Sequence, residues 1–278
     1  MFEIFQYDFM VRAFIAGLIV AVIAPIIGAF LVFRRYSYMA DTLGHVSLLG
    51  VVLAVLTGLP PLVGAVGISI LFSFGIETLR QNKKFFGESI LSLFLSGSLA
   101  LALVLASFQK GFSSQFMSFL FGSITTVTSQ DIFTIGILGI IIFFCILIFY
   151  QKFFLITLDE ELSRAEGLPV RFYNLIMIFL SALTVALSLR IVGVLLIGAL
   201  MVIPVMAAVQ WGKSFIQTIF IAVFFSLLST LGGLFISFYF EFPSGAMIVL
   251  FSLVFFLFSL IFSQKKGRKK LAKTGKNW

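Results

Sequence analysis

The sequence predicts an all-α, polytopic membrane protein. Of its 278 residues, 61% are hydrophobic and only 11% are charged, whereas soluble domains carry about 25% charged residues. Apolar runs that are long enough to cross roughly 30 Å of hydrocarbon as helices recur from one end of the chain to the other. The single cysteine, Cys145, excludes a disulfide within one chain. Little of the chain is left over for a soluble domain.

Nine transmembrane spans are expected, in one transmembrane domain that covers residues 1–264 and is followed by a basic tail, 265–278. The first residues include Glu3 and Asp8 but no basic n-region, so we expect no cleavable signal peptide. The apolar runs place the spans at 13–33, 38–57, 60–76, 90–108, 131–150, 172–189, 191–211, 216–239 and 244–262.

The basic residues predict the orientation of the chain. Seven of the 19 lie between Lys265 and Lys276, a tail that is most simply cytoplasmic. Alternating nine spans backwards from this tail places the N-terminus outside, with sixteen basic residues inside and three outside. The inner residues before the tail are Arg34, Arg35, Arg80, Lys83, Lys84, Lys152, Arg164, Arg171 and Lys213, and the outer ones are Arg12, Lys110 and Arg190. The net charge of +8 therefore reflects topology and not nucleic-acid binding.

Small and polar residues predict which spans lie inside the bundle. The span 38–57 is the least apolar, and Ala40, Gly44 and Ser47 form a stripe on it that allows a neighbouring helix to approach closely. The span 191–211 has a comparable small-residue pattern that includes Gly198. The span 13–33 is the third interior candidate, with a kink expected near its proline. The segment 111–130 is too polar to span a membrane, and we expect it to be re-entrant or interfacial.

The span 38–57 contains an aspartate and the only histidine of the chain, Asp41 and His45. Residues four apart project from the same face of a helix, so a carboxylate and an imidazole can converge on one ion. This donor pair suits zinc or manganese better than sodium or potassium. Because an ionisable group within a membrane is costly, the pair predicts an ion path. Water, another helix or another subunit must supply the remaining ligands.

The alternative is that Asp41 accepts a hydrogen bond from His45 and only orients it. Other conspicuous side chains are better explained structurally. Methionines in apolar helices usually fill the core, and carboxylates at the ends of spans usually cap helices or meet solvent. These residues are Met201, Met206, Glu88, Asp131 and Glu241.

The predicted inner loop 156–174 contains a short amphipathic helix on the cytoplasmic face, expected near 158–168. Thr157 or Asp159 can cap its acidic first turn, Gly167 can end it, and Pro169 prevents its continuation. An ordinary solvated connector is the alternative. The chain contains no nucleotide-binding apparatus, so a transporter of this kind must use an ion gradient or a separate ATPase.

Four stretches resemble the membrane permeases of metal-ion ABC importers, which take up zinc, manganese or iron, and they follow one another along the chain in the order that the family has. The first, Phe33 to Val51, is similar to the family signature, and LDEELSRAEGLPV is similar to its cytoplasmic coupling segment. The other two are FLFGSITTV, from Phe119 to Val127, and VGVLLIGALMVIPVMAA, from Val192 to Ala208. The sequence MADTLGHVSLLG looks more like the zinc permeases than the manganese permeases.

The resemblance implies a multi-pass permease of the bacterial cytoplasmic membrane that has no catalytic activity or bound cofactor of its own. Its transported substrate would be a divalent metal, zinc or manganese, and Asp41 and His45 would line the path. The implied partners are a second copy of the chain, two cytoplasmic ATPase subunits, an extracytoplasmic metal-binding protein and membrane lipid, with no nucleic acid. Coupling to the ATPase would fall on Asp159, Glu160, Glu161, Arg164 and Gly167.

Two other functions compete with this interpretation. A secondary metal carrier, coupled to protons or sodium, would need more buried carboxylates or histidines than this chain offers. An intramembrane enzyme or an assembly scaffold is the other alternative, but one histidine and one cysteine leave little for hydrolytic chemistry.

Overall fold

The computed structural model describes residues 4, 6–80, 87–108, 113–211 and 214–274, and every regular element in these ranges is helical. The all-α prediction is therefore confirmed. In chain order the elements are α1 (Asp8–Phe33), α2 (Tyr38–Thr57), α3 (Pro61–Arg80), α4 (Gly87–Ser107), α5 (Ser113–Phe121), the 3-10 helix η2 (Ile124–Thr126), α6 (Ser129–Leu158), α7 (Glu160–Ala165), α8 (Val170–Ser188), α9 (Val194–Val209), α10 (Phe215–Phe240) and α11 (Ser244–Thr274).

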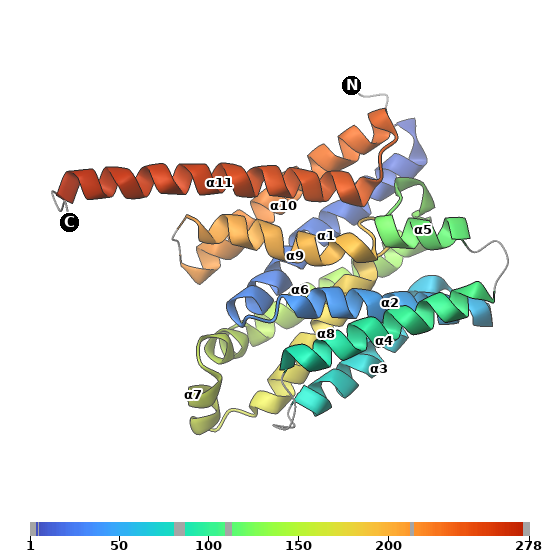
Figure 1. Cartoon of the computed structure of the whole chain (residues 1–278), viewed down its shortest axis with the longest axis horizontal. Helices are drawn as coiled ribbons and strands as arrows, with labels where there is room; N and C mark the ends of the chain where they lie inside the picture. The colour runs from blue at the N-terminus through green and yellow to red at the C-terminus, as the bar shows by residue number, and fades with distance from the viewer. Residues whose placement is uncertain (1–3, 5, 81–86, 109–112, 212–213, 275–278) are drawn as a thin grey trace.

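Eight of the described helices are long and apolar enough to cross a membrane, and they pack into one bundle (Figure 1). They are α1, α2, α3, α4, α6, α8, α10 and the Ser244–Ser263 part of α11. The polytopic prediction is thus confirmed, and each of these helices overlaps a predicted span.

The seventh predicted span, 191–211, differs from the structure. Its helix, α9, has 16 residues, which is about 24 Å of helix. The predicted beginning of this span is a turn, because Gly193 has φ +85° and packs on the backbone around Gly122. A Cβ atom at residue 193 would overlap the Gly122 nitrogen and the Leu120 carbonyl oxygen. This turn shortens the helix below the length expected from hydropathy alone.

The last helix is longer than its predicted span. It continues without a break from Ser244 to Thr274 and extends beyond the rest of the bundle, as the red ribbon in Figure 1 shows. Lysine and arginine are good helix formers, so the basic tail can continue the helix that the apolar span begins. The predicted boundary at residue 264 therefore does not coincide with a helix end.

The two ends of the bundle are defined by contacts between loops. At one end, here called the α7 end, Arg34 after α1 contacts Glu160 of α7 and Asn174 of α8. At the opposite end, the Ser123 N–H donates to the Arg190 carbonyl, and Ser244 donates to the carbonyl of Ile191. The predicted inner residues Arg34, Arg35, Arg80, Arg164 and Arg171 belong to the α7 end. Lys83, Lys84, Lys110, Lys213 and Lys276 lie outside the described residues.

The interior helices include those that small residues predicted, and also α8, whose apolar window is 67% buried and which was not predicted to be interior. The most apolar windows of α2 and α1 are 78% and 72% buried, against 22% for α4 and α6. The helices α4 and α6 therefore expose broad apolar surfaces. A Cβ atom at Gly28 of α1 would overlap the Met201 carbonyl oxygen of α9. The absence of a side chain at residue 28 thus brings α1 and α9 into backbone contact.

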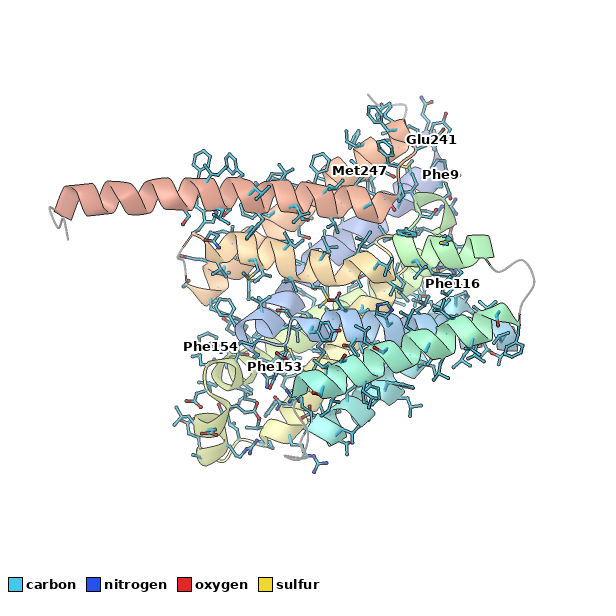
Figure 2. The ribbon with its side chains drawn as sticks, in the orientation of Figure 1. Phe9, Phe116, Phe153, Phe154, Glu241 and Met247 are labelled. Carbon is cyan, nitrogen blue, oxygen red and sulfur yellow. The ribbon has the colours of Figure 1, made fainter. Side chains whose placement is uncertain are left out.

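Aromatic side chains pack the α7 end of the bundle. Phe30 of α1 lies 5.9 Å from Phe153 of α6 and 5.1 Å from Phe215 of α10, measured between ring centroids. Phe154 contacts Phe215 at 5.2 Å (Figure 2). Such ring pairs add to the stability gained by apolar burial. They hold three helices together next to the loop that leads from α1 into α2.

The polar segment 111–130 folds at the opposite end. Its residues from 113 onwards form α5 and η2, and α5 packs against α9. The turn at Gly122 has φ +76°, and a Cβ atom there would overlap the Ile191 carbonyl oxygen. The segment is therefore fixed to the loop between α8 and α9.

Candidate functional site

Asp41 and His45 lie on the interior helix α2, close to the end that faces α7. Asp41 belongs to the first turn of α2, and His45 follows one turn later. The His45 side chain is buried, with 9% of the residue exposed, and Asp41 is half-buried. A rise of about 1.5 Å per residue places the pair within the first two to three turns of the helix. The candidate site is therefore nearer to α7 than to the opposite end.

The Asp41 carboxylate lies directly against the backbone of α9. A Cβ atom at Gly198 would overlap Asp41 Oδ1. One turn away, a Cβ atom at Gly44 would lie 3.2 Å from the Val194 carbonyl oxygen. The predicted small-residue stripe on α2 thus meets the predicted small-residue helix α9, and the candidate pair lies at this contact.

The two ionisable side chains are not joined to each other. Within the described part of the chain, neither a hydrogen bond nor an ion pair links Asp41 to His45. His45 Nδ1 is buried and has no hydrogen-bond partner. A buried polar nitrogen without a partner is costly. This nitrogen and the nearby carboxylate are available to a ligand.

The described residues do not provide a complete metal-binding cluster in one chain. Nowhere in the described ranges do three or more His, Cys, Asp or Glu side chains come together as a metal site would require. Asp41 and His45 supply two donors. Additional ligands would have to be backbone oxygens, water or groups of another chain.

The other faces of α2 are fixed to α3 and α4. The hydroxyls of Ser47 and Ser69 are 2.6 Å apart, and Thr42 donates to the Leu91 carbonyl oxygen at 3.3 Å. Further along, a Cβ atom at Gly50 would overlap the carbonyl oxygen of Gly64. Buried hydroxyl pairs and close backbone contacts of this kind fix the relative position of helices. They orient the Asp41 face of α2 towards α9.

The short helix α7 forms as its sequence predicted. Asp159 caps it, because its carboxylate accepts a hydrogen bond from the Leu162 N–H at 2.9 Å. The chain leaves the helix at Gly167, which has φ +82°, and the Leu168 N–H returns to the Ser163 carbonyl oxygen. Thr157 belongs to α6 and is not the cap. Leu162 is 58% exposed and projects an apolar side chain from this helix.

Glu160 of α7 is held by two buried groups: Arg34, which follows α1, and Asn174 of α8, whose Nδ2 donates to Glu160 Oε1 at 3.4 Å. Arg34 Nη2 donates to Glu160 Oε2 at 3.0 Å and to Asn174 Oδ1 at 2.7 Å. Arg164 donates to Glu160 Oε1 at 3.1 Å, from a side chain that is 66% exposed. Burial lowers the pKa of Arg34, and the Glu160 carboxylate opposes this effect. Arg34 is thereby the main link between α7 and the loop before α2.

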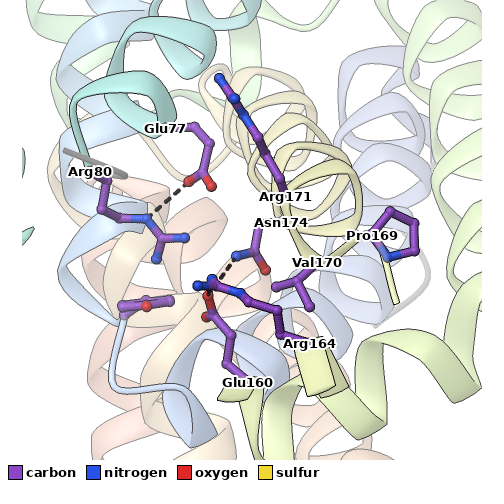
Figure 3. A pocket seen from close by; sticks show the side chains of 9 residues that line it. Glu77, Arg80, Glu160, Arg164, Pro169, Val170, Arg171 and Asn174 are labelled. Atoms are coloured by element: carbon purple, nitrogen blue, oxygen red, sulfur yellow. Dashed lines mark hydrogen bonds and ion pairs between the residues drawn. The ribbon is translucent and has the colours of Figure 1, made fainter. Parts of the chain in front are cut away.

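Tyr36 extends this link to α3. The guanidinium of Arg34 lies 5.1 Å from the Tyr36 ring centroid, and that of Arg80 lies 4.5 Å from it. Arg80 also donates to Glu77 at 2.9 Å. Figure 3 shows the residues that line a cavity of about 520 Å³ next to this cluster, among them Glu77 and Arg80 of α3, Glu160 and Arg164 of α7, and Arg171 and Asn174 of α8. The α1–α2 loop, α3, α7 and α8 therefore meet at one polar cluster.

The remaining candidates have structural roles. Asp131 caps α6 in a reciprocal arrangement with Thr128 and pairs with Arg190 at 3.0 Å. Glu88 is in the first turn of α4. Glu241 is an exposed loop residue at the opposite end (Figure 2). Met201 is fully buried, as a core residue would be, whereas Met206 is 38% exposed.

Three residues that contact Asp41 or Glu160, or that lie next to such a contact, were not predicted from the sequence to do so. Arg34 was interpreted only as a topology signal, although a buried arginine requires an acceptor. Asn174 was included only as the last residue of the inner loop. Gly198 was interpreted as a packing residue, and nothing in the sequence indicates that its neighbour is Asp41. These relationships depend on how distant segments pack.

The fold and the site define a class of protein: a multi-pass membrane protein with an aspartate and a histidine at an interior helix contact and a capped helix at one end. The sequence model of the family described as "ABC 3 transport family" matches residues 6–263. The chain therefore belongs to the ABC 3 transport family, whose members are membrane subunits of transporters.

Curated relatives are similar along nearly the whole chain. The "Probable iron transport system membrane protein" of Haemophilus influenzae is 31% identical over 96% of this chain and 98% of its own length. The "High-affinity zinc uptake system membrane protein ZnuB" of the same organism is 29% identical over 92% and 98%. The "Manganese transport system membrane protein MntC" of Listeria innocua is 29% identical over 94% and 93%.

A solved structure supports the same fold. A chain of "PsaBC from Streptococcus pneumoniae in complex with Fab" superimposes with a TM-score of 0.84 at 30% identity, covering 92% of each chain. The chain is accordingly a multi-pass protein of the cytoplasmic membrane.

Proposed function

We propose that this chain is the permease subunit of an ATP-driven importer of divalent metal ions, with zinc as the transported ion. The observation that carries the proposal is the pair Asp41 and His45, whose buried His45 Nδ1 has no partner. An imidazole nitrogen and a carboxylate are suitable donors for zinc. The names of the similar proteins, which specify iron, zinc and manganese transport, support a metal ion as substrate.

The functional unit we propose is a dimer of this chain with two ATPase subunits and an extracytoplasmic metal-binding protein. The two donors in one chain are fewer than zinc usually takes, so a second copy or water completes the shell. A transport site that is incomplete in each chain can also release its ion. Uptake would occur along the contact between α2 and α9, with the α7 end in the cytoplasm.

The proposed coupling element is α7, with Asp159, Glu160, Glu161, Arg164 and Gly167. Asp159 and Gly167 define its two ends, and Glu160 anchors it to Arg34. Glu161 and Leu162 are exposed and are available to an ATPase groove. Closure of the ATPase pair would push α7, and Arg34 would transmit the displacement to α2.

Manganese or iron import by the same mechanism is the second candidate, because similar proteins carry those names. Carboxylate ligands suit manganese, so Asp41 alone does not discriminate between the metals. Uptake measured separately with zinc, manganese and iron discriminates between these ions. The family favours the ATP-driven mechanism over a proton- or sodium-coupled carrier.

The proposal is tested by reconstituting this chain with its ATPase and binding protein in liposomes. We expect ATP-dependent zinc uptake that is abolished in Asp41→Ala and in His45→Ala, with ATPase binding retained. Thr57→Ala, at the exposed far end of α2, is the matched control and should transport normally. Zinc uptake by the chain alone under a pH gradient would instead establish secondary transport, and normal uptake in both variants would remove the pair from the path.

A further inference from the structure

Gly198 occupies the point at which the Asp41 side chain meets α9. A Cβ atom at residue 198 would overlap Asp41 Oδ1 and would lie 2.7 Å from Asp41 Cγ. The carboxylate thus occupies the space that any side chain at 198 would need. Its position depends on the presence of glycine on the facing helix.

This contact differs from the other close glycine contacts. A Cβ atom at Gly28 would meet the Met201 backbone, and one at Gly233 would meet the backbone of Ile248 at 2.6 Å. Those glycines allow one backbone to approach another, which is ordinary helix packing. Among the glycines in the described part of the chain, Gly198 is the one whose added Cβ would meet a carboxylate.

The surroundings of the contact point to a ligand. His45, one turn along α2, has its buried Nδ1 without a partner. Gly44, between them in sequence, keeps α2 close to the Val194 carbonyl oxygen. The α9 backbone therefore lies beside the Asp41 carboxylate, one turn of α2 from the unpartnered His45 nitrogen.

We propose that Gly198 is a positioning residue for ion transport: it admits the Asp41 carboxylate to the α2–α9 contact, where this group and His45 can bind the ion together. This inference rests on the proposed function, because it assumes that Asp41 binds the transported ion. A methyl group at 198 forces the carboxylate off α9 and away from the geometry that the ion requires. Gly198 acts through Asp41 and does not itself bind the ion.

A double-mutant cycle on thermal stability tests the contact without any transport assay. We expect Gly198→Ala to lower the Tm of the purified chain when Asp41 is present, and to leave the Tm nearly unchanged in the Asp41→Ala background. Gly44→Ala changes the same helix contact without meeting the carboxylate, and should shift the Tm equally in both backgrounds. Equal shifts for Gly198→Ala in the two backgrounds would overturn the proposal.

Uptake by the complex with its ATPase and binding protein provides the functional readout. We expect Gly198→Ala to reduce zinc uptake by roughly tenfold or more, with Gly67→Ala as a control, since a Cβ atom at Gly67 meets nothing within 4 Å. If Gly198→Ala does not accumulate, recovery of expression in the Asp41→Ala/Gly198→Ala double variant supports the same contact. Undiminished uptake in Gly198→Ala would overturn the positioning role. Normal uptake in Asp41→Ala would instead identify the proposed ion path as the part that fails.

Discussion

Arg34 at the end of α1 donates a 3.0 Å hydrogen bond to Glu160 of α7, and the chain then enters α2 through one short loop. The same guanidinium is buried, with 6% of its side chain exposed. Because a buried charge depends on its partner, displacement of Glu160 must move Arg34 or break the pair. A mechanical connection therefore joins the proposed ATPase-binding helix to the helix that carries Asp41.

Replacing Glu160 should disrupt this connection. We expect Glu160→Ala to lower the free energy of unfolding by about 2 kcal/mol, because Arg34 loses a charged acceptor. We also expect ATP hydrolysis to continue with little transport. The measurement is the ratio of zinc transported to ATP hydrolysed in the reconstituted complex.

A comparison variant, Arg164→Ala, and a control, Glu166→Ala, sharpen the Glu160 experiment. Arg164→Ala breaks only the exposed pair, so its effect on stability should lie within about 1 kcal/mol and its effect on coupling should be smaller. Glu166→Ala removes an exposed carboxylate just after α7 and should leave the ratio unchanged. An unaltered ratio in Glu160→Ala would contradict the coupling role of this side chain.

The buried pair at the opposite end should contribute to stability. Asp131→Ala removes the Asp131 half of the capping box at the start of α6 and an ion-pair partner of Arg190, so we expect a loss of about 2–4 kcal/mol in the free energy of unfolding. Thermal unfolding of the purified chain measures this effect. Glu241→Ala, an exposed carboxylate at the same end, is the control and should change the Tm little. Equal Tm values for the two variants would rule out this role for Asp131.

The turn before α9 should be intolerant of a side chain. We expect Gly193→Ala to destabilise the protein by about 2–4 kcal/mol, since φ +85° is strained for alanine and the Cβ atom would overlap the turn at Gly122. Gly67→Ala is again the matched control, because it lies on a helix with open space around it. A circular dichroism melt of each variant is sufficient, and a Tm for Gly193→Ala equal to that of the control would show that the turn can relax.

Hydropathy and small residues were sufficient to predict most of the fold. The span 38–57 coincides with α2, and its polar residues correctly indicated burial in the bundle. The predicted beginning of α9 was wrong because Gly193 packs on Gly122, a contact between segments about 70 residues apart in the chain. Local composition does not encode such a contact. Hydropathy also assigned the basic tail to a separate segment, whereas helix propensity lets α11 continue.

Only the part of the candidate site that lies on one helix could be predicted from the sequence. Asp41 and His45 are neighbours on one helix, so their spacing is sufficient to pair them. Gly198, Arg34 and Asn174 come from other helices, and only tertiary packing brings them to Asp41 or Glu160. Arg34 offered a weak signal, since one of two adjacent arginines at a span end can turn inward. The orientation of the chain in the membrane remains a prediction from its basic residues.

The most direct test measures the uptake of radioactive zinc and manganese by cells that make this chain together with its partner subunits. Cells with the wild-type chain are compared with cells that make His45→Ala at matched expression. We expect zinc uptake in the wild type and loss of that uptake in the variant. Manganese uptake in place of zinc would contradict the choice of metal. Zinc uptake that is indifferent to His45 would contradict the path along α2.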